Sequence, residues 1–73
     1  MAARIYSASD VGRIIKDRRI SAGLTQAEVA EMAGINRSYL SELEAGATSA
    51  QVERLVSLLK LLGLRLVAVE ADW

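Results

Sequence analysis

Residues 24–46, LTQAEVAEMAGINRSYLSELEAG, constrain the fold of this chain most, because they hold the start and stop signals of two short helices in close succession. Thr25 is a favourable N-cap, and Glu28 stands three residues later, where it completes a capping box. Gly34 can supply the left-handed turn that a short connection needs, and Asn36 is a second N-cap. These signals predict helices over residues 26–33 and 37–44, which together form a helix-turn-helix.

The second of these helices is amphipathic, with two sides of different chemistry. At about 100° per residue, its inward side carries Leu40, Leu43 and Glu44, and its outward side carries Ser38, Ser41 and Glu42. A small, polar outward face is suited to the DNA major groove, where side chains form hydrogen bonds with base edges. The alternative is a helix face that is simply solvated.

The same segment resembles the helix-turn-helix of the lambda-repressor-like (Xre) family. The matching positions are Thr25, Gln26, Ala30, Gly34, Leu40, Leu43, Glu44 and Gly46. The resemblance implies a domain that reads DNA with the helix ending at Glu44. It also implies that Arg19, on a preceding helix, forms a structural ion pair with Glu44; the alternative is that Arg19 contacts a phosphate.

The composition limits the other function classes. With 73 residues we expect one domain whose core is marginal alone, and with neither cysteine nor histidine the chain has no disulfide and no usual zinc ligands. Oligomerisation is the remaining common reinforcement. Carboxylates and lysines without a clefted scaffold are poor general acids and bases, so we expect no enzyme, no catalytic residue, no metal site and no cofactor.

Charge and hydropathy indicate the cellular localisation of the protein and the chemistry of its binding partners. The net charge is zero, but residues 1–26 hold five basic against two acidic side chains, and the remainder of the chain is correspondingly acidic. This polarity is compatible with DNA on one side and a basic protein on the other. The apolar stretch 58–69 is too short to span a bilayer, and no signal peptide is visible, so we expect a cytoplasmic protein without a membrane partner.

The first and last helices complete the predicted core, which covers residues 8–63. Ser7 and Asp10 predict a capping box for a helix reaching about Ser21. Its inward stripe is Val11, Ile14, Ile15, Arg18 and Ala22. Thr48 or Ser49 caps a last helix that ends at Leu62 before Gly63, and its core stripe is Val52, Leu55, Val56, Leu59 and Leu62.

The C-terminal segment predicts a dimer. Leu58 and Leu61 extend the apolar arc of the last helix beyond the needs of one small core, and residues 64–70, LRLVAVE, read as one strand. Pairing of this strand across a two-fold axis would satisfy its unpaired edge. The expected dimer interface is Leu58, Leu61, Leu64, Leu66, Val67 and Val69. The alternatives are a continued helix, or pairing with residues 4–6 of the same chain. The fold class is thus all-α with one short strand.

The two ends narrow the resemblance to one branch. IYS before the first helix and GLRLVAV after the last resemble HipB-type antitoxins. That branch implies a homodimer that represses its own operon and neutralises a HipA-type serine/threonine kinase toxin. The tail, residues 71–73, together with Glu70 is the candidate toxin contact: Glu70, Asp72 and Trp73. The alternatives are a stand-alone Xre-family repressor, or a protein-interaction module that has lost DNA binding.

A dimer implies a palindromic operator, with half-sites about 34 Å apart in successive major grooves. Arg37 is the first candidate for a base contact, because a guanidinium can bind guanine O6 and N7 together. Thr25 and Gln26 lie at a helix N-terminus suited to a phosphate. The complete set of expected DNA-binding residues is Thr25, Gln26, Asn36, Arg37, Ser38, Tyr39, Ser41 and Glu42, of which Tyr39 can instead pack on the turn and Glu42 can instead be solvated.

Overall fold

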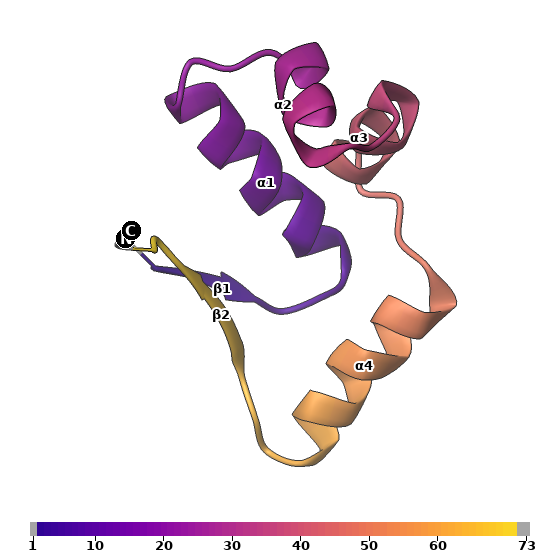
Figure 1. The fold of residues 1–73 in the computed structure, drawn as a ribbon. Coiled ribbons are helices and arrows are strands. Elements are labelled where there is room, and N and C mark those ends of the chain that lie inside the picture. The colour runs from indigo at the N-terminus through magenta and orange to yellow at the C-terminus, as the bar shows by residue number, and fades with distance from the viewer. Residues whose placement is uncertain (1, 72–73) are drawn as a thin grey trace.

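Short-range capping signals set where the helices begin and end. The computed structural model describes residues 2–71, which form a short two-stranded sheet and four helices (Figure 1). In chain order the elements are β1 (Ala2–Ile5), α1 (Ser9–Ser21), α2 (Gln26–Ala33), α3 (Arg37–Glu44), α4 (Ala50–Leu61) and β2 (Leu66–Val69). The protein is therefore mostly helical, as the sequence predicts, but it contains a second strand that the predicted fold class lacked.

The helix-turn-helix has the caps that the sequence predicts. The Thr25 hydroxyl accepts a hydrogen bond from the Glu28 backbone N–H at 3.1 Å, and the Glu28 carboxylate accepts one from the Thr25 N–H at 2.9 Å. Gly34 takes a φ of 69°, which lets the chain turn directly from α2 toward α3. The Asn36 side chain then accepts from the Ser38 N–H at 2.8 Å, so α3 begins at Arg37.

The start of α1 has one of the two hydrogen bonds of the predicted capping box, that from the Ser7 N–H to the Asp10 carboxylate, and lacks the one to the Ser7 hydroxyl. The Asp10 carboxylate accepts hydrogen bonds from the backbone N–H groups of Tyr6 (2.7 Å) and Ser7 (3.0 Å), whereas the Ser7 hydroxyl lies 3.0 Å from that of Ser9. These backbone hydrogen bonds lower the pKa of Asp10 below its ordinary value. Asp10 thus fixes the connection between β1 and α1, and the helix begins at Ser9 rather than after Ser7.

The C-terminal strand pairs within its own chain. β2 lies antiparallel to β1, with Ala2 opposite Val69 and Ile5 opposite Leu66. Of the pairings that the sequence left open, the structure shows the one with the N-terminal segment. The prediction that this strand pairs with a second chain is therefore corrected for one of its two edges. That edge of β2 forms its backbone hydrogen bonds with β1 of the same chain. The short alternation of residues 4–6 is compatible with an extended segment, and the structure places the strand slightly earlier, at Ala2–Ile5.

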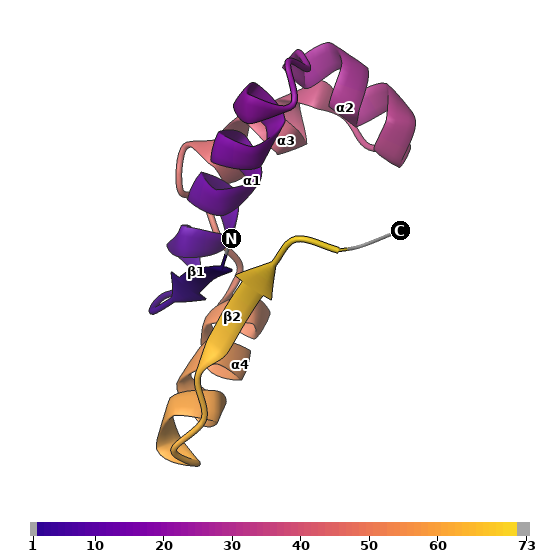
Figure 2. The same ribbon diagram turned by 90° about the vertical axis from the view of Figure 1, so that its left-hand side faces the viewer.

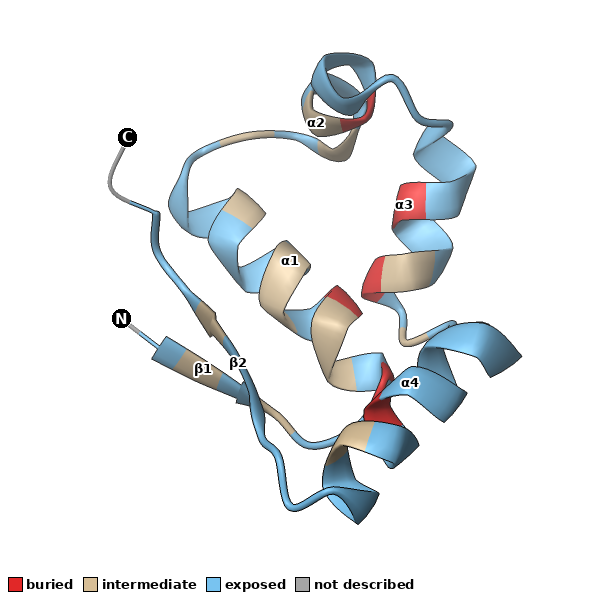
Figure 3. Cartoon of the chain, turned by 60° about the horizontal axis from the view of Figure 1, so that its bottom comes forward, coloured by how far each residue is buried: buried red, intermediate tan, exposed pale blue. Residues whose placement is uncertain are grey.

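The buried residues come from all four helices and from Ala8, which directly precedes α1. Leu40 of α3 is only 1% exposed, and Ala8, Ala30 and Val56 are the other buried hydrophobic residues (Figure 3). Gly12 of α1 is also buried, because α1 crosses α3 at very close range: a Cβ atom at this position would lie 1.7 Å from the Leu43 carbonyl oxygen. The predicted inward stripe of α1 overlooked Gly12, and it included Arg18 and Ala22, which are exposed.

The last helix stands apart from the first three. α1 packs against α3 and α2 against α3, whereas α4 lies apart from this group and contacts the other described elements only weakly (Figures 1 and 2). As a result the predicted core stripe of α4 is wrong in part: Val56 is buried and Leu59 half-buried, but Val52, Leu55 and Leu62 are exposed. Leu58 and Leu61, which the sequence placed outside the core, are exposed as expected.

The close crossing at Gly12 generates a stability prediction. Gly12→Ala should lower the free energy of unfolding by about 2 kcal/mol or more, because the new methyl group forces α1 and α3 apart, although alanine favours a helix more than glycine does. The measurement is urea unfolding followed by circular dichroism. Asp17→Ala, at an exposed position of the same helix, is the control and should change stability little. A Gly12→Ala variant as stable as this control would show that the crossing is not close.

Candidate nucleic-acid interface

The exposed face of α3 collects the polar side chains that the sequence proposed for base contact. Arg37, Ser38, Ser41 and Glu42 together line a shallow hollow of about 330 Å³, and all four are exposed. They come from successive turns of one helix, so one guanidinium, two hydroxyls and one carboxylate face the same direction. The hollow therefore offers both hydrogen-bond donors and hydrogen-bond acceptors, and none of the side chains that line it is bulky and apolar.

The opposite face of α3 fixes the helix to the rest of the protein. Leu40 is fully buried, Leu43 is half-buried, and only 3% of the Glu44 side chain is exposed. A buried carboxylate requires partners, because the loss of its hydration is costly. Glu44 is therefore the residue around which the local geometry is built.

The structure brings together Arg19 and Glu44, for which the sequence analysis expected an ion pair. Arg19 Nε donates to Glu44 Oε2 at 2.7 Å and Arg19 Nη2 donates to Glu44 Oε1 at 2.9 Å, so the pair is bidentate. Arg19 Nη1 also donates to the Leu24 carbonyl oxygen at 2.9 Å. The planar guanidinium thus joins α1 to the end of α3 and to the loop before α2.

Gln26 completes this network. Its Nε2 donates to Glu44 Oε1 at 3.0 Å, so the side chain faces the ion pair and its amide nitrogen is engaged within the protein. The sequence analysis placed Gln26 at a phosphate and missed this contact. A glutamine directly after an N-cap carries no signal for it, because the contact joins two helices separated by 18 residues. Three helices therefore converge on one carboxylate.

The hydrogen bonds that Arg19 and Gln26 donate hold the pKa of Glu44 below its ordinary value of 4.5, although burial alone would raise it. The same hydrogen bonds between Arg19 and Glu44 raise the pKa of Arg19. Both groups are therefore charged at neutral pH. A carboxyl group whose pKa is lower in the folded state stabilises the fold fully above its unfolded pKa. That stabilisation is lost as the pH falls through the folded value.

The remaining candidate DNA-binding residues do not line the hollow. The side-chain oxygens of Thr25 and Asn36 are engaged as helix caps. Tyr39 is 55% exposed and lies outside the residues that line the hollow. Of the candidate DNA-binding residues, the structure thus brings Arg37, Ser38, Ser41 and Glu42 together around one hollow.

The C-terminal residues that the sequence proposes for toxin contact are not among those that line this hollow. Glu70 pairs with Arg18 of α1 at 3.1 Å, and Asp72 and Trp73 lie outside the described residues. Among residues 2–71 no three His, Cys, Asp or Glu side chains gather so as to hold a metal ion. No helix in this part of the chain is long and apolar enough to cross a bilayer.

Comparison with known proteins agrees with this geometry. Residues 15–69 match the helix-turn-helix family. The chain is 35% identical, over 63 residues, to an uncharacterized HTH-type transcriptional regulator, y4mF, of Sinorhizobium fredii; the matched region covers 86% of this chain and 83% of that protein. No solved structure gives a significant match.

The network around Glu44 generates a prediction about Arg19. Arg19→Ala leaves a buried carboxylate without its counter-ion, so the melting temperature should fall by at least about 10 °C. Arg18→Ala is the matched control: this neighbouring guanidinium makes an exposed ion pair, and its removal should lower the melting temperature by no more than about 3 °C. Thermal unfolding followed by circular dichroism measures both, and equal melting temperatures would show that Arg19 has no structural role.

Proposed function

Because this chain belongs to the helix-turn-helix family, we propose that it is a DNA-binding transcriptional regulator that acts in the cytoplasm as a homodimer and represses transcription from a palindromic operator. The observation that carries the proposal is the exposed group Arg37, Ser38, Ser41 and Glu42 on one face of α3, whose other face is anchored through buried Glu44. A rigidly held helix with small polar outward side chains can enter the major groove deeply enough to reach base edges.

Each side chain of this group has a distinct role in the proposed complex. Arg37 lies at the first position of α3 and binds guanine O6 and N7 with two parallel hydrogen bonds. Ser38 and Ser41 form hydrogen bonds with base edges or phosphates, and their small size permits close approach. Glu42 accepts from a cytosine amino group and repels phosphates in a wrong register. The N-terminus of α2 faces a phosphate through the backbone N–H group of Gln26, because that of Thr25 is engaged by Glu28.

A second copy explains how a protein of zero net charge binds DNA specifically. Two α3 helices on one rigid dimer read two half-sites about 34 Å apart, so the base contacts are doubled without more positive charge. The residues available for the dimer are apolar and exposed in the single chain: Leu58, Leu61, Leu64, Leu66, Val67 and Val69. Exposed apolar surface of this extent is characteristic of an interface.

Operator binding generates a prediction about Arg37. Arg37→Ala should weaken binding to the selected operator by about 10- to 100-fold and relax specificity at one base pair of each half-site, because a bidentate base contact is lost. Fluorescence anisotropy across a salt series measures affinity and the number of phosphate contacts. Arg54→Ala, an exposed arginine of α4, is the control and should keep the affinity of the wild-type protein. Unchanged affinity of Arg37→Ala would contradict the assigned base contact, and affinity independent of salt would favour an interaction module without DNA binding.

A second proposed role is that of an antitoxin. What supports it is the resemblance of both chain ends to HipB-type proteins, together with the pairing of those ends, β1 and β2, into one ribbon at the surface. In this role the protein represses its own operon and neutralises a HipA-type serine/threonine kinase toxin. The tail after β2, with Glu70, Asp72 and Trp73, is the proposed contact with the toxin.

The antitoxin role predicts a stable complex with the product of an adjacent gene. Co-expression of the two proteins, with a tag on the neighbour only, should recover both in one peak on size-exclusion chromatography. A variant ending at Val69 should bind the neighbour at least about tenfold more weakly because the acidic and aromatic tail is absent. Separate elution of the two full-length proteins would favour a stand-alone repressor.

A further inference from the structure

The single chain exposes more surface than a folded monomer of its size. Its accessible surface is 5587 Å², whereas a folded monomer of 7.9 kDa exposes about 4,400 Å². The radius of gyration is likewise 13.0 Å, against about 11 Å for a compact chain of this length. The excess, roughly 1,200 Å², is on the order of what one partner contributes to a standard protein interface, about 800 Å². The chain therefore exposes about one interface more than a closed monomer would.

Part of this exposed surface lies on α4, where three leucines form a row. Leu55, Leu58 and Leu62 are spaced by three and four residues and are 57%, 51% and 64% exposed. This spacing places the three side chains on one side of a helix, as in the seam of a coiled coil. We call this row the α4 seam. Leu55 and Leu62 were assigned to the chain's own core by the sequence pattern, which cannot distinguish a core within one chain from a core shared by two.

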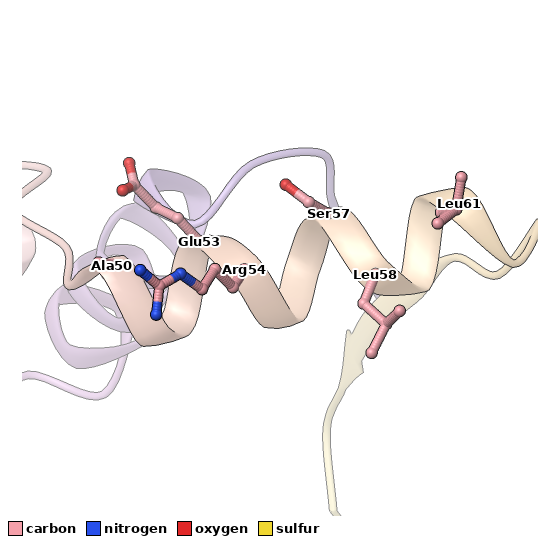
Figure 4. A pocket seen from close by; sticks show the side chains of 6 residues that line it. All are labelled: Ala50, Glu53, Arg54, Ser57, Leu58 and Leu61. Carbon is pink, nitrogen blue, oxygen red and sulfur yellow. The ribbon is translucent and has the colours of Figure 1, made fainter.

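The neighbouring face of α4 is a less favourable contact surface. It carries a hollow of about 590 Å³ lined by Ala50, Glu53, Arg54, Ser57, Leu58 and Leu61. Figure 4 shows Glu53 and Ser57 on one side of α4 and Leu58 pointing to the other. Packing a helix into this hollow would bury two charged side chains, which costs free energy unless each finds a partner. The α4 seam, in contrast, contains only leucine.

We infer that α4 packs antiparallel against α4 of a second copy through the seam, with Leu55 of each chain facing Leu58 of the other. This inference rests on the proposed dimer and names the surface that forms it. The exposed area supports a second copy as the occupant. A two-fold axis that crosses α4 between Leu55 and Leu58 places each of these leucines opposite the other one in the second copy, and it places Leu62 opposite the exposed Gln51 of that copy. The seam then forms a core that neither chain completes alone.

The antiparallel direction follows from where α4 is attached. Residues 45–49 join its N-terminus to α3, so two parallel α4 helices would bring both copies of α3 to the same end. Antiparallel helices place the two copies of α3 at opposite ends of a helix pair about 18 Å long, where both can face successive grooves. Opposed helix dipoles also favour this direction.

Charge complementation between two single variants tests the arrangement. Leu55→Glu and Leu58→Lys should each weaken self-association by about 30-fold or more, because each places a charge against a leucine of the partner. An equimolar mixture of the two variants should restore dimers to within about tenfold of the wild-type affinity, because the carboxylate introduced in one chain then faces the ammonium group introduced in the other. Ser57→Lys, at an exposed position on the hollow side of α4 and outside the proposed dimer interface, is the control and should dimerise like the wild-type chain. Sedimentation equilibrium at micromolar concentration measures the wild-type chain, the three variants and the mixture.

Each outcome supports or overturns a specific claim. A monomeric wild-type chain would overturn the proposed dimer itself, whereas variants at Leu55 and Leu58 that stay dimeric beside a dimeric wild-type chain would overturn the seam alone. Restoration by mixing Leu55→Glu with Leu55→Lys, and not with Leu58→Lys, would overturn the antiparallel direction. Circular dichroism establishes that the variants are folded. If the charged variants unfold, Leu55→Ala and Ser57→Ala replace them, and equal dimer affinity of these two overturns the seam.

Discussion

A buried carboxylate at the end of α3 is the constraint on which the rest of the structure depends. α3 has eight residues, and an isolated helix of that length is not stable in water. It is ordered because Glu44 is held by Arg19 of α1 and Gln26 of α2, and because Gly12 lets α1 approach the α3 backbone. These contacts set which side of α3 faces outward, and therefore where Arg37 points. The charged network gives this short helix a fixed orientation that apolar packing of Leu40 and Leu43 alone would leave less specific.

The parts of the fold that the sequence predicts are those that depend on neighbouring residues. The caps at Thr25 and Asn36 and the left-handed glycine at Gly34 act over three or four residues, so their signals are complete within the local sequence. Long-range features were predicted less well. The partner of β2 lies at the other end of the chain, and Gly12 matters because of a backbone atom of Leu43, which no apolar periodicity reveals.

The candidate site shows the same division. The amphipathic pattern of α3 predicts which side chains face outward, and they line one hollow. The Arg19–Glu44 pair came from a family resemblance rather than from spacing, and the contact of Gln26 with Glu44 was not predicted. On α4 the apolar pattern shows which residues avoid water, but not whether they meet their own chain or another. In the proposed dimer the two halves of the protein have different tasks: α1 and α2 hold α3 for contact with DNA, and α4 with the strands sets the spacing between the two copies of α3.

The central claim is that α3 enters the major groove of DNA, and the most direct test is chemical protection of guanine N7, which lies in that groove. The DNA is a duplex that the protein itself selects from a random pool. The account predicts protected guanines in two groups about 34 Å apart, one helical turn, on the same face of the duplex. A saturated protein–DNA complex in which every guanine N7 reacts as in free DNA would contradict it.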